Sequence, residues 1–226
     1  MIQRDYILRM IEEFCRALEA LVALKEGRRW QEVAGTLDEQ FNQLLGAGAS
    51  MAVEFSETDL LARLLHGEGT QFIREKQLFL IALFKEAGDA AVAQDRMDEG
   101  RTFYLKGLHL LLGTWTGMGP SECPEFVPRV DVFVSALRGL PLPTRTLALL
   151  MQYYERTGSF AKAEDAFFAL LDVEPGNSRL IDFGIAFYQR LQSQSNEALV
   201  AGDLPRAEVE AGLGELRDRE AALLST

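Results

Sequence analysis

The chain has 226 residues, of which 48% are hydrophobic and 25% are charged. This composition is typical of a globular protein that buries a core of its own. The net charge is −11, and the acidity is spread evenly, with −5 over residues 1–114 and −6 over residues 115–226. Because nucleic acids and anionic membrane surfaces are bound through clustered Lys and Arg, we expect neither nucleic-acid nor membrane-surface binding.

Cysteine content and apolar run length give an expectation for location. Two cysteines, Cys15 and Cys123, are too few for a disulfide framework. The first residues carry charge without a signal-peptide cleavage site, and no apolar run approaches the ~20 residues that a bilayer-spanning helix needs. We therefore expect a reduced, cytoplasmic protein.

The N-terminal residues follow a helical period. Apolar side chains recur at spacings of three and four, which predicts a helix over residues 7–24 with one apolar face: Ile7, Ile11, Phe14, Leu18 and Leu21. Leu8, Cys15 and Val22 form a second stripe beside this face. The combined apolar surface is wide, so another part of the chain or a second copy must cover it.

Five more helices are predicted before residue 140. They span about residues 30–45, 57–65, 71–93, 96–112 and 126–138. Ser56 and Asp59 have the spacing of a capping box, which favours a helix start at this point. Alternating patterns typical of strands are scarce.

A stretch rich in glycine and proline follows the predicted helix over residues 96–112. Five of the seven prolines lie between Pro120 and Pro143. We interpret residues 113–125 as an ordered connection between helical parts. A plain loop is the simpler interpretation, and a binding loop that carries Trp115 and Cys123 is the alternative.

Four helices are predicted in the remaining residues, over about 144–157, 160–173, 178–200 and 203–224. Turn residues separate them, namely Gly158, the segment 174–177, and Gly202 with Asp203. Because a proline near the start of a helix loses no hydrogen bond, Pro205 fits the beginning of the last helix.

Residues 144–177 resemble a tetratricopeptide repeat, a 34-residue helical hairpin. The residues at the family spacings are Tyr154, Ala163, Phe167 and Pro175, with Leu150, Gly158 and Phe160 at further matching positions. Three positions depart from the pattern, namely Leu147, Met151 and Leu170. Residues 81–114 match more weakly, with glycines where the family has alanine. Segments near Asp5 and Glu86 also resemble an uncharacterised bacterial family with such helices, which brings no activity with it.

The predicted fold is all-α, with antiparallel helical hairpins stacked as a short, irregular tetratricopeptide-like solenoid. We expect one domain over residues 1–226. The alternative is two lobes, residues 1–112 and 126–226, joined by the Gly/Pro-rich connection 113–125.

Motifs for catalysis and for cofactor binding are missing from the sequence. There is no phosphate loop, dinucleotide fingerprint or nucleophile elbow. The two histidines, His66 and His109, lie far apart without cysteine pairs at zinc spacing. We therefore expect no cofactor, no metal and no enzymatic activity.

The leading hypothesis is a protein–protein interaction module that binds a protein or peptide on a concave helical surface. By the resemblance, polar positions of the first helices would face the partner: Lys85, Asp89, Arg145, Gln152 and Glu155. One alternative is a homodimer sealed by the apolar N-terminal helix. The other is a small-molecule binder or enzyme that uses a groove between the lobes near Trp115 and Cys123.

Overall fold

The computed structural model describes residues 2–65, 72–114 and 124–224, and these residues form twelve α-helices and no strand. The all-α prediction is therefore confirmed for the described part of the chain. None of the helices in these ranges combines the length and the apolar character that crossing a bilayer requires. The chain divides into two compact units, residues 1–140 and residues 141–226.

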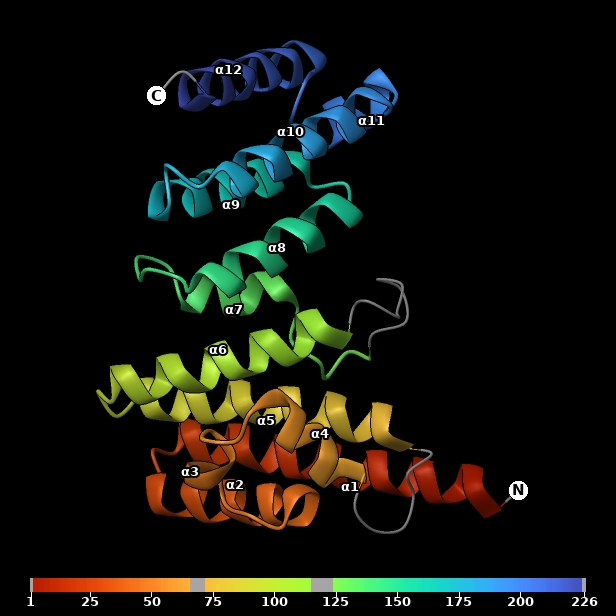
Figure 1. The fold of residues 1–226 in the computed structure, drawn as a ribbon. Helices are drawn as coiled ribbons and strands as arrows, with labels where there is room; N and C mark the ends of the chain where they lie inside the picture. Colours follow the sequence, from red (N-terminus) through yellow and green to blue (C-terminus); the bar gives the residue numbers. More distant parts are fainter. Residues whose placement is uncertain (1, 66–71, 115–123, 225–226) are drawn as a thin grey trace. The chain divides into compact units, whose positions relative to one another are not determined.

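The first unit contains seven helices (Figure 1). Their bounds are α1 Ile2–Glu26, α2 Trp30–Leu45, α3 Ala49–Ala52, α4 Glu57–Leu65, α5 Ile73–Val92, α6 Met97–Thr114 and α7 Val130–Ala136. The helix α5 is the centre of this unit, because it packs against α1, α2, α4 and α6. Its residues 78–84 are all buried, which explains why this part of the sequence has no polar face.

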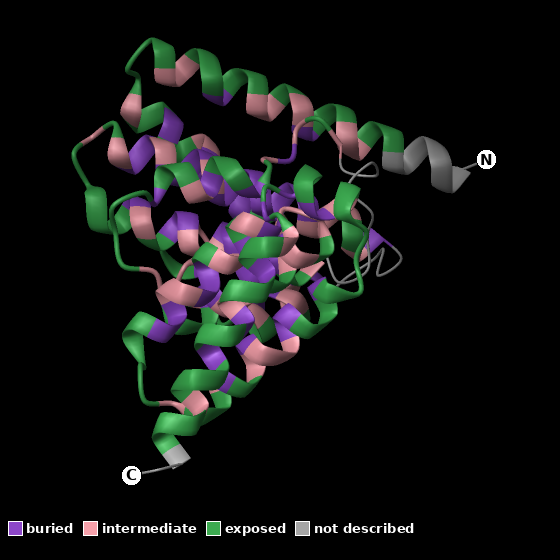
Figure 2. Cartoon of the chain, turned by 90° about the horizontal axis from the view of Figure 1, so that it is seen from above, coloured by how far each residue is buried: buried purple, intermediate pink, exposed green. Residues whose placement is uncertain are grey.

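Aromatic packing fixes α1 on α5. The rings of Phe14 and Phe79 stack with centroids 4.1 Å apart, and Phe126 meets Phe14 edge-on at 5.6 Å. Phe14 and Leu21 are buried, whereas Leu8 and Val22 on the neighbouring stripe are 49% and 45% exposed. The described residues of the unit thus bury only part of the apolar surface of α1, and Figure 2 shows mostly exposed and intermediate residues along this helix.

The helix α4 begins with the predicted capping box. The backbone N–H of Asp59 donates to Ser56 Oγ at 3.1 Å, and the backbone N–H of Ser56 donates to Asp59 Oδ2 at 3.2 Å. Two backbone donors that the first helical turn leaves without a partner are satisfied in this way. The hydrogen bond from the Ser56 hydroxyl also lowers the pKa of Asp59.

The second unit contains five helices. Their bounds are α8 Thr144–Arg156, α9 Phe160–Val173, α10 Ser178–Gln192, α11 Asn196–Ala201 and α12 Arg206–Leu224. The helix α8 packs along α9, and α10 packs along α12. Small residues allow the close approach: Ala163 is fully buried, and a side chain at Gly184 would meet the Phe167 ring and Leu216.

One helix prediction in this unit is wrong. The expected continuous helix over residues 178–200 is divided into α10 and α11, because Ser193–Ser195 leaves the helical path. The Ser195 hydroxyl accepts a hydrogen bond from the backbone N–H of Ala198 at 3.1 Å and so begins a new helix. Arg206 then holds the break together, with bonds to Asn196 Oδ1 and to the carbonyl oxygens of Gln192 and Gln194.

The division between the units differs from the expected lobe boundary at 113–125. The helix α7 packs on α6, where the Phe133 ring lies edge-on to Tyr104 at 6.5 Å. Gly107 makes this contact possible, since a Cβ at that position would lie 2.7 Å from the Phe133 ring. Residues 126–140 therefore belong with the first unit, and the change of unit falls at residues 140–141.

Candidate functional site

The second unit carries a groove with a volume of about 950 Å³. The end of α8, the α8–α9 turn, the start of α9, α10 and α11 form its walls. Its lining combines apolar, amide and charged side chains: Gln152, Glu155, Arg156, Thr157, Gly158, Phe160, Phe183, Arg190, Leu191, Gln194, Ala198 and Ala201. We call this feature the α8–α11 groove.

The α8–α9 turn shapes one end of the groove. Gly158 has φ +74°, a left-handed conformation that glycine adopts without strain. The Thr157 hydroxyl donates to the carbonyl oxygen of Tyr153 at 3.1 Å, and the Ser159 N–H donates to that of Tyr154 at 2.9 Å. These bonds satisfy carbonyl groups at the end of α8 and allow the chain to turn directly into α9.

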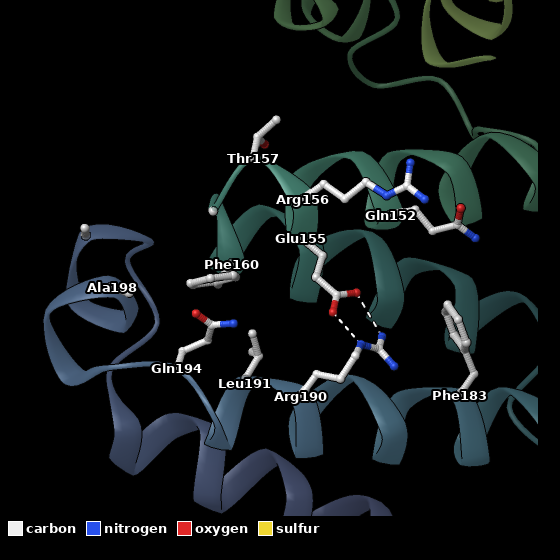
Figure 3. A pocket seen from close by; sticks show the side chains of 12 residues that line it. Gln152, Glu155, Arg156, Thr157, Phe160, Phe183, Arg190, Leu191, Gln194 and Ala198 are labelled. Carbon is white, nitrogen blue, oxygen red and sulfur yellow. Dashed lines mark hydrogen bonds and ion pairs between the residues drawn. The ribbon is translucent and has the colours of Figure 1, made fainter. Parts of the chain in front are cut away.

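An ion pair links α8 and α10 in the middle of the groove. Arg190 donates from Nε to Glu155 Oε1 at 2.6 Å and from a terminal nitrogen to Glu155 Oε2 at 2.9 Å (Figure 3). The hydrogen bond with Glu155 raises the pKa of Arg190, although partial burial acts in the opposite direction. This bidentate geometry fixes the orientation of both side chains.

Apolar side chains flank the ion pair. In Figure 3, Phe160 and Leu191 lie on one side of the Glu155–Arg190 pair, and Phe183 lies on the other. Phe160 is 5% exposed and Leu191 is buried, while Phe183 is partly exposed. A side chain at Gly202 would meet both the Phe160 ring and the carbonyl oxygen of Gly158, at 2.4 and 2.5 Å. The groove thus has an apolar floor whose position depends on a close backbone contact.

The rim of the groove is polar and exposed. Gln152, Arg156 and Gln194 all belong to the exposed class. A carboxamide offers two donor hydrogens and one acceptor oxygen, so it can pair with both the C=O and the N–H groups of a peptide backbone. Arg156 has no ion pair with another described residue, so the groove carries one cationic group in excess of the balanced Glu155–Arg190 pair.

Two of the five predicted site residues line the groove, namely Gln152 and Glu155. Arg145 lies in the first turn of the same helix, about two turns before Gln152, and is outside the lining. The two predicted residues in the C-terminal half of α8 therefore lie in the groove. The other lining residues from α10 and α11 were not predicted from the sequence.

Lys85 and Asp89, the other two predicted residues, lie in the first unit within a cluster of charged side chains. Lys85 Nζ is 2.7 Å from Asp89 Oδ2 and 3.1 Å from Glu86 Oε1. Lys25 from α1 pairs with Glu86 and, at 3.0 Å, with Asp89. We call these four residues and Tyr104, which donates to Asp89 Oδ1 at 2.9 Å, the Lys25 cluster.

The pKa shifts in the Lys25 cluster follow from its pairing. Burial alone would raise the pKa of Asp89, but the hydrogen bond from Lys85 and the charges of Lys25 and Lys85 together lower it. Burial, followed by the nearby Asp89 carboxylate, raises the pKa of Tyr104. The cluster joins α1, α5 and α6 by internal bonds.

The remaining sequence candidates are the two histidines, Trp115 and Cys123. No group of three or more His, Cys, Asp or Glu side chains within residues 2–65, 72–114 and 124–224 is arranged to hold a metal ion. His109 Nδ1 lies 3.3 Å from Glu57 Oε1, between α6 and α4. Trp115, Cys123 and His66 lie outside the described residues.

The chain belongs to a family of unknown function, DUF6483, whose model matches residues 1–221. The expected resemblance to an uncharacterised family is confirmed at this level. A search of curated proteins and a search of solved structures each gave no match to the chain. The function of the groove is therefore inferred from the residues that form it.

Proposed function

We propose that this DUF6483 member is a protein-interaction module that binds an extended peptide segment of a partner protein in the α8–α11 groove. The observation that carries the proposal is the groove itself, where an apolar floor lies between exposed amide and guanidinium groups. Interfaces that recognise peptides combine these elements, with apolar pockets for side chains and polar groups for the backbone.

The finer fold that we propose for the second unit is a tetratricopeptide-like pair of hairpins. Tyr154, Ala163 and Phe167, which carry the sequence resemblance, are all buried where α8 packs on α9. The Glu155–Arg190 pair joins residues 35 positions apart, close to the 34-residue period of such repeats. In this interpretation α8 and α10 are the first helices of consecutive hairpins, and their facing sides form the binding surface.

The chemistry of the groove favours a peptide over a reaction. Among the described residues that line it, the one carboxylate is that of Glu155, which is engaged by Arg190. The one hydroxyl, that of Thr157, donates to backbone carbonyl groups. The groove volume is at the upper end of the ~300–1,000 Å³ typical of ligand sites. The side chains therefore supply contacts and hydrogen bonds, and we propose binding without catalysis.

Charge gives a preference within peptides. Arg156 is exposed at the rim, whereas the protein as a whole carries a net charge of −11. A peptide with an acidic side chain beside apolar ones would pair with Arg156. A basic side chain in the same place would be repelled by Arg156 and Arg190. We therefore expect an acidic side chain to be preferred at the position that faces Arg156, against the repulsion from the net charge of the protein.

The test is selection of a displayed random-peptide library on the full chain, followed by fluorescence anisotropy with the enriched peptides. The double variant Gln152→Ala/Gln194→Ala should weaken binding about tenfold or more. Its matched control, Gln31→Ala/Gln189→Ala, removes two exposed glutamines outside the groove and should bind as the wild type does. Arg156→Glu should reverse the charge preference, whereas Arg179→Glu should not.

Two results would overturn the proposal. The first is a library that yields no peptide enriched on the wild type over an unrelated acidic helical protein. The second is an enriched peptide that binds the groove variants and their controls with equal affinity, because the binding surface would then lie elsewhere.

A further inference from the structure

The helix α1 carries more apolar surface than the described residues of the first unit bury. The buried stripe includes Phe14 and Leu21, at 4% and 0% exposure. Beside it runs a row of apolar residues at spacings of three, four, three and four, which joins the second stripe to Ile11 and Leu18 of the first face: Leu8, Ile11, Cys15, Leu18 and Val22. Leu8 and Val22 are 49% and 45% exposed, and the three residues between them are partly exposed. We call this set the α1 seam.

The spacing of the α1 seam is that of a helix that pairs with another helix. An apolar residue every 3.5 positions on average keeps one side of a helix facing a partner helix, as in coiled coils. From Leu8 to Val22 the seam is about 21 Å long at 1.5 Å per residue. Phe14, on the inward side of α1, already packs on Phe79 of α5. The apolar surface of the seam is therefore larger than packing of α1 on α5 needs.

Charges beside the seam specify the partner and its direction. Along the solvent side of the seam the order is Arg9, Glu12, Arg16, Glu19, and all four side chains are exposed. Read in the opposite direction, the same row begins with an acid and alternates in the complementary order. An antiparallel copy of α1 therefore places each arginine near a glutamate. A parallel copy related by a two-fold axis along the helices places the two charged rows on opposite edges of the interface, where they do not meet.

We propose that the α1 seam is the interface of a homodimer in which the two α1 helices pair antiparallel about a two-fold axis near Cys15. In this register Leu8 lies opposite Val22 of the second copy, and Cys15 lies opposite its own equivalent. Arg9 lies within two residues of Glu19 of the second copy, and Arg16 within two residues of its Glu12. A two-fold interface must be complementary to itself, and this surface meets that condition.

The inference is independent of peptide binding in the α8–α11 groove, since α1 belongs to the first unit and the groove to the second. The α1 seam is short and only partly exposed, so the dimer would bury a small area. We therefore expect a dissociation constant in the micromolar range. At lower concentrations the monomer should be stable, because the core of the unit uses the other stripe of α1.

The first test is sedimentation velocity of the full chain over about 1–200 µM without added peptide. The wild type should shift from monomer to dimer over this range. Leu8→Glu/Val22→Glu should remain monomeric at every concentration and keep its helical circular dichroism. The matched control Met97→Glu/Val173→Glu replaces two residues of similar exposure, 56% and 58%, and should dimerise as the wild type does. A wild type that stays monomeric at 200 µM, or a control as impaired as the seam variant, overturns the proposal.

The second test determines direction. In a Cys15→Ser/Cys123→Ser background, a mixture of Leu8→Cys and Val22→Cys chains should form a disulfide-linked heterodimer under mild oxidation, and each variant alone should not. Arg16→Glu should raise the dimer dissociation constant at least tenfold at low salt, and Glu12→Arg added to it should restore the affinity. Efficient self-linkage of Leu8→Cys alone would show a parallel pair and contradict the antiparallel assignment.

Discussion

Tyr188 in α10 donates a hydrogen bond of 2.5 Å to Glu164 Oε1 in α9. The Tyr188 side chain is buried, and Glu164 is half-buried between the two helices. Desolvation raises the pKa of Glu164, the Tyr188 bond acts against that rise, and the nearby carboxylates of Glu208, Asp165 and Glu215 add to it. The carboxylate of Glu164 is thus less favourable in the folded protein than in the unfolded chain.

The first prediction concerns the pH dependence that follows from Glu164. A carboxyl group with a raised folded pKa stabilises the fold when protonated, and this stability is lost as pH rises from the ordinary value of 4.5 through the folded pKa. Glu164→Gln keeps an acceptor for Tyr188 without the charge. We expect it to raise stability at pH 7 by about 0.5 kcal/mol, a figure reduced for partial solvent exposure.

Thermal unfolding from pH 7 to pH 4 measures this effect. The gain in Tm of about 1–2 °C should shrink as pH falls, because the wild-type carboxyl then becomes protonated. Glu210→Gln, on an exposed position of α12, should leave Tm unchanged throughout. A Glu164→Gln variant that is less stable than the wild type at pH 7 would show that the carboxylate charge is favourable.

The second prediction concerns Lys25. Lys25→Met removes one of the two described lysines that pair with Glu86, which is only 8% exposed, and with Asp89. Lys85 is the other of the two. Breaking a buried pair by removing one partner is strongly destabilising, and for this partly exposed cluster we expect a loss of about 2 kcal/mol. Urea denaturation measures it, and Arg219→Met, which breaks an exposed pair with Glu215 on α12, should cost less than about 0.5 kcal/mol.

The third prediction concerns acid stability. A lowered folded pKa means that Asp89 stabilises the protein above its ordinary value of 3.8, and that this contribution is lost as pH falls through the folded pKa. Asp89→Asn should therefore be less stable than the wild type at pH 7, and the difference should narrow below about pH 4. A constant difference between pH 7 and pH 3 would mean that charge is not the source of the stabilisation.

The fourth prediction concerns the contact between α8 and α9. Ala163 is fully buried, so Ala163→Leu should destabilise the protein by about 1–3 kcal/mol through overpacking. Ala207→Leu, on an exposed turn of α12, is the matched control and should change stability by less than about 0.5 kcal/mol. Equal melting curves for Ala163→Leu and the wild type would contradict the packing described for this hairpin.

The fifth prediction contrasts two glycines. A Cβ at Gly202 would lie 2.5 Å from the carbonyl oxygen of Gly158, so Gly202→Ala should displace the α8–α9 turn and lower stability by more than about 1 kcal/mol. Nothing lies within 4 Å of a Cβ at Gly214, inside α12. Gly214→Ala should therefore stabilise the protein by about 0.5–1 kcal/mol, because alanine loses less backbone entropy in a helix. Differential scanning calorimetry separates the two, and the same sign for both would refute the comparison.

Helix positions could be predicted from sequence where apolar periodicity and local caps agree. The helix α2 occupies the predicted residues 30–45, and Ser56 with Asp59 begins α4 as expected. The prediction failed at Ser193–Ser195, because the apolar period continues across the break. There the carbonyl groups that a continuous helix would bond internally are held by Arg206, a side chain from a later helix.

The groove could be predicted only in part, because half of its lining comes from a hairpin that is distant in the sequence. Gln152 and Glu155 were found from their register in one hairpin, but Phe183, Arg190 and Gln194 belong to the next one. The spacing of 35 residues from Glu155 to Arg190 is a signal that could have found the second half. Lys85 was predicted, like Gln152, from its position in the first helix of a hairpin. Lys25, 60 residues earlier in the chain, pairs with the same carboxylates as Lys85, and this long-range contact could not be predicted.

The clamp formed by Arg206 links the groove to the C-terminal helix. Its guanidinium group holds the carbonyl oxygen of Gln194, whose side chain lines the groove, and Arg206 is also the first residue of α12. A ligand that restricts the motion of Gln194 therefore also favours the hydrogen bond between Arg206 and the Gln194 carbonyl oxygen. Hydrogen–deuterium exchange at the first turn of α12 should slow when the groove is occupied, so this helix reports on binding without touching the ligand.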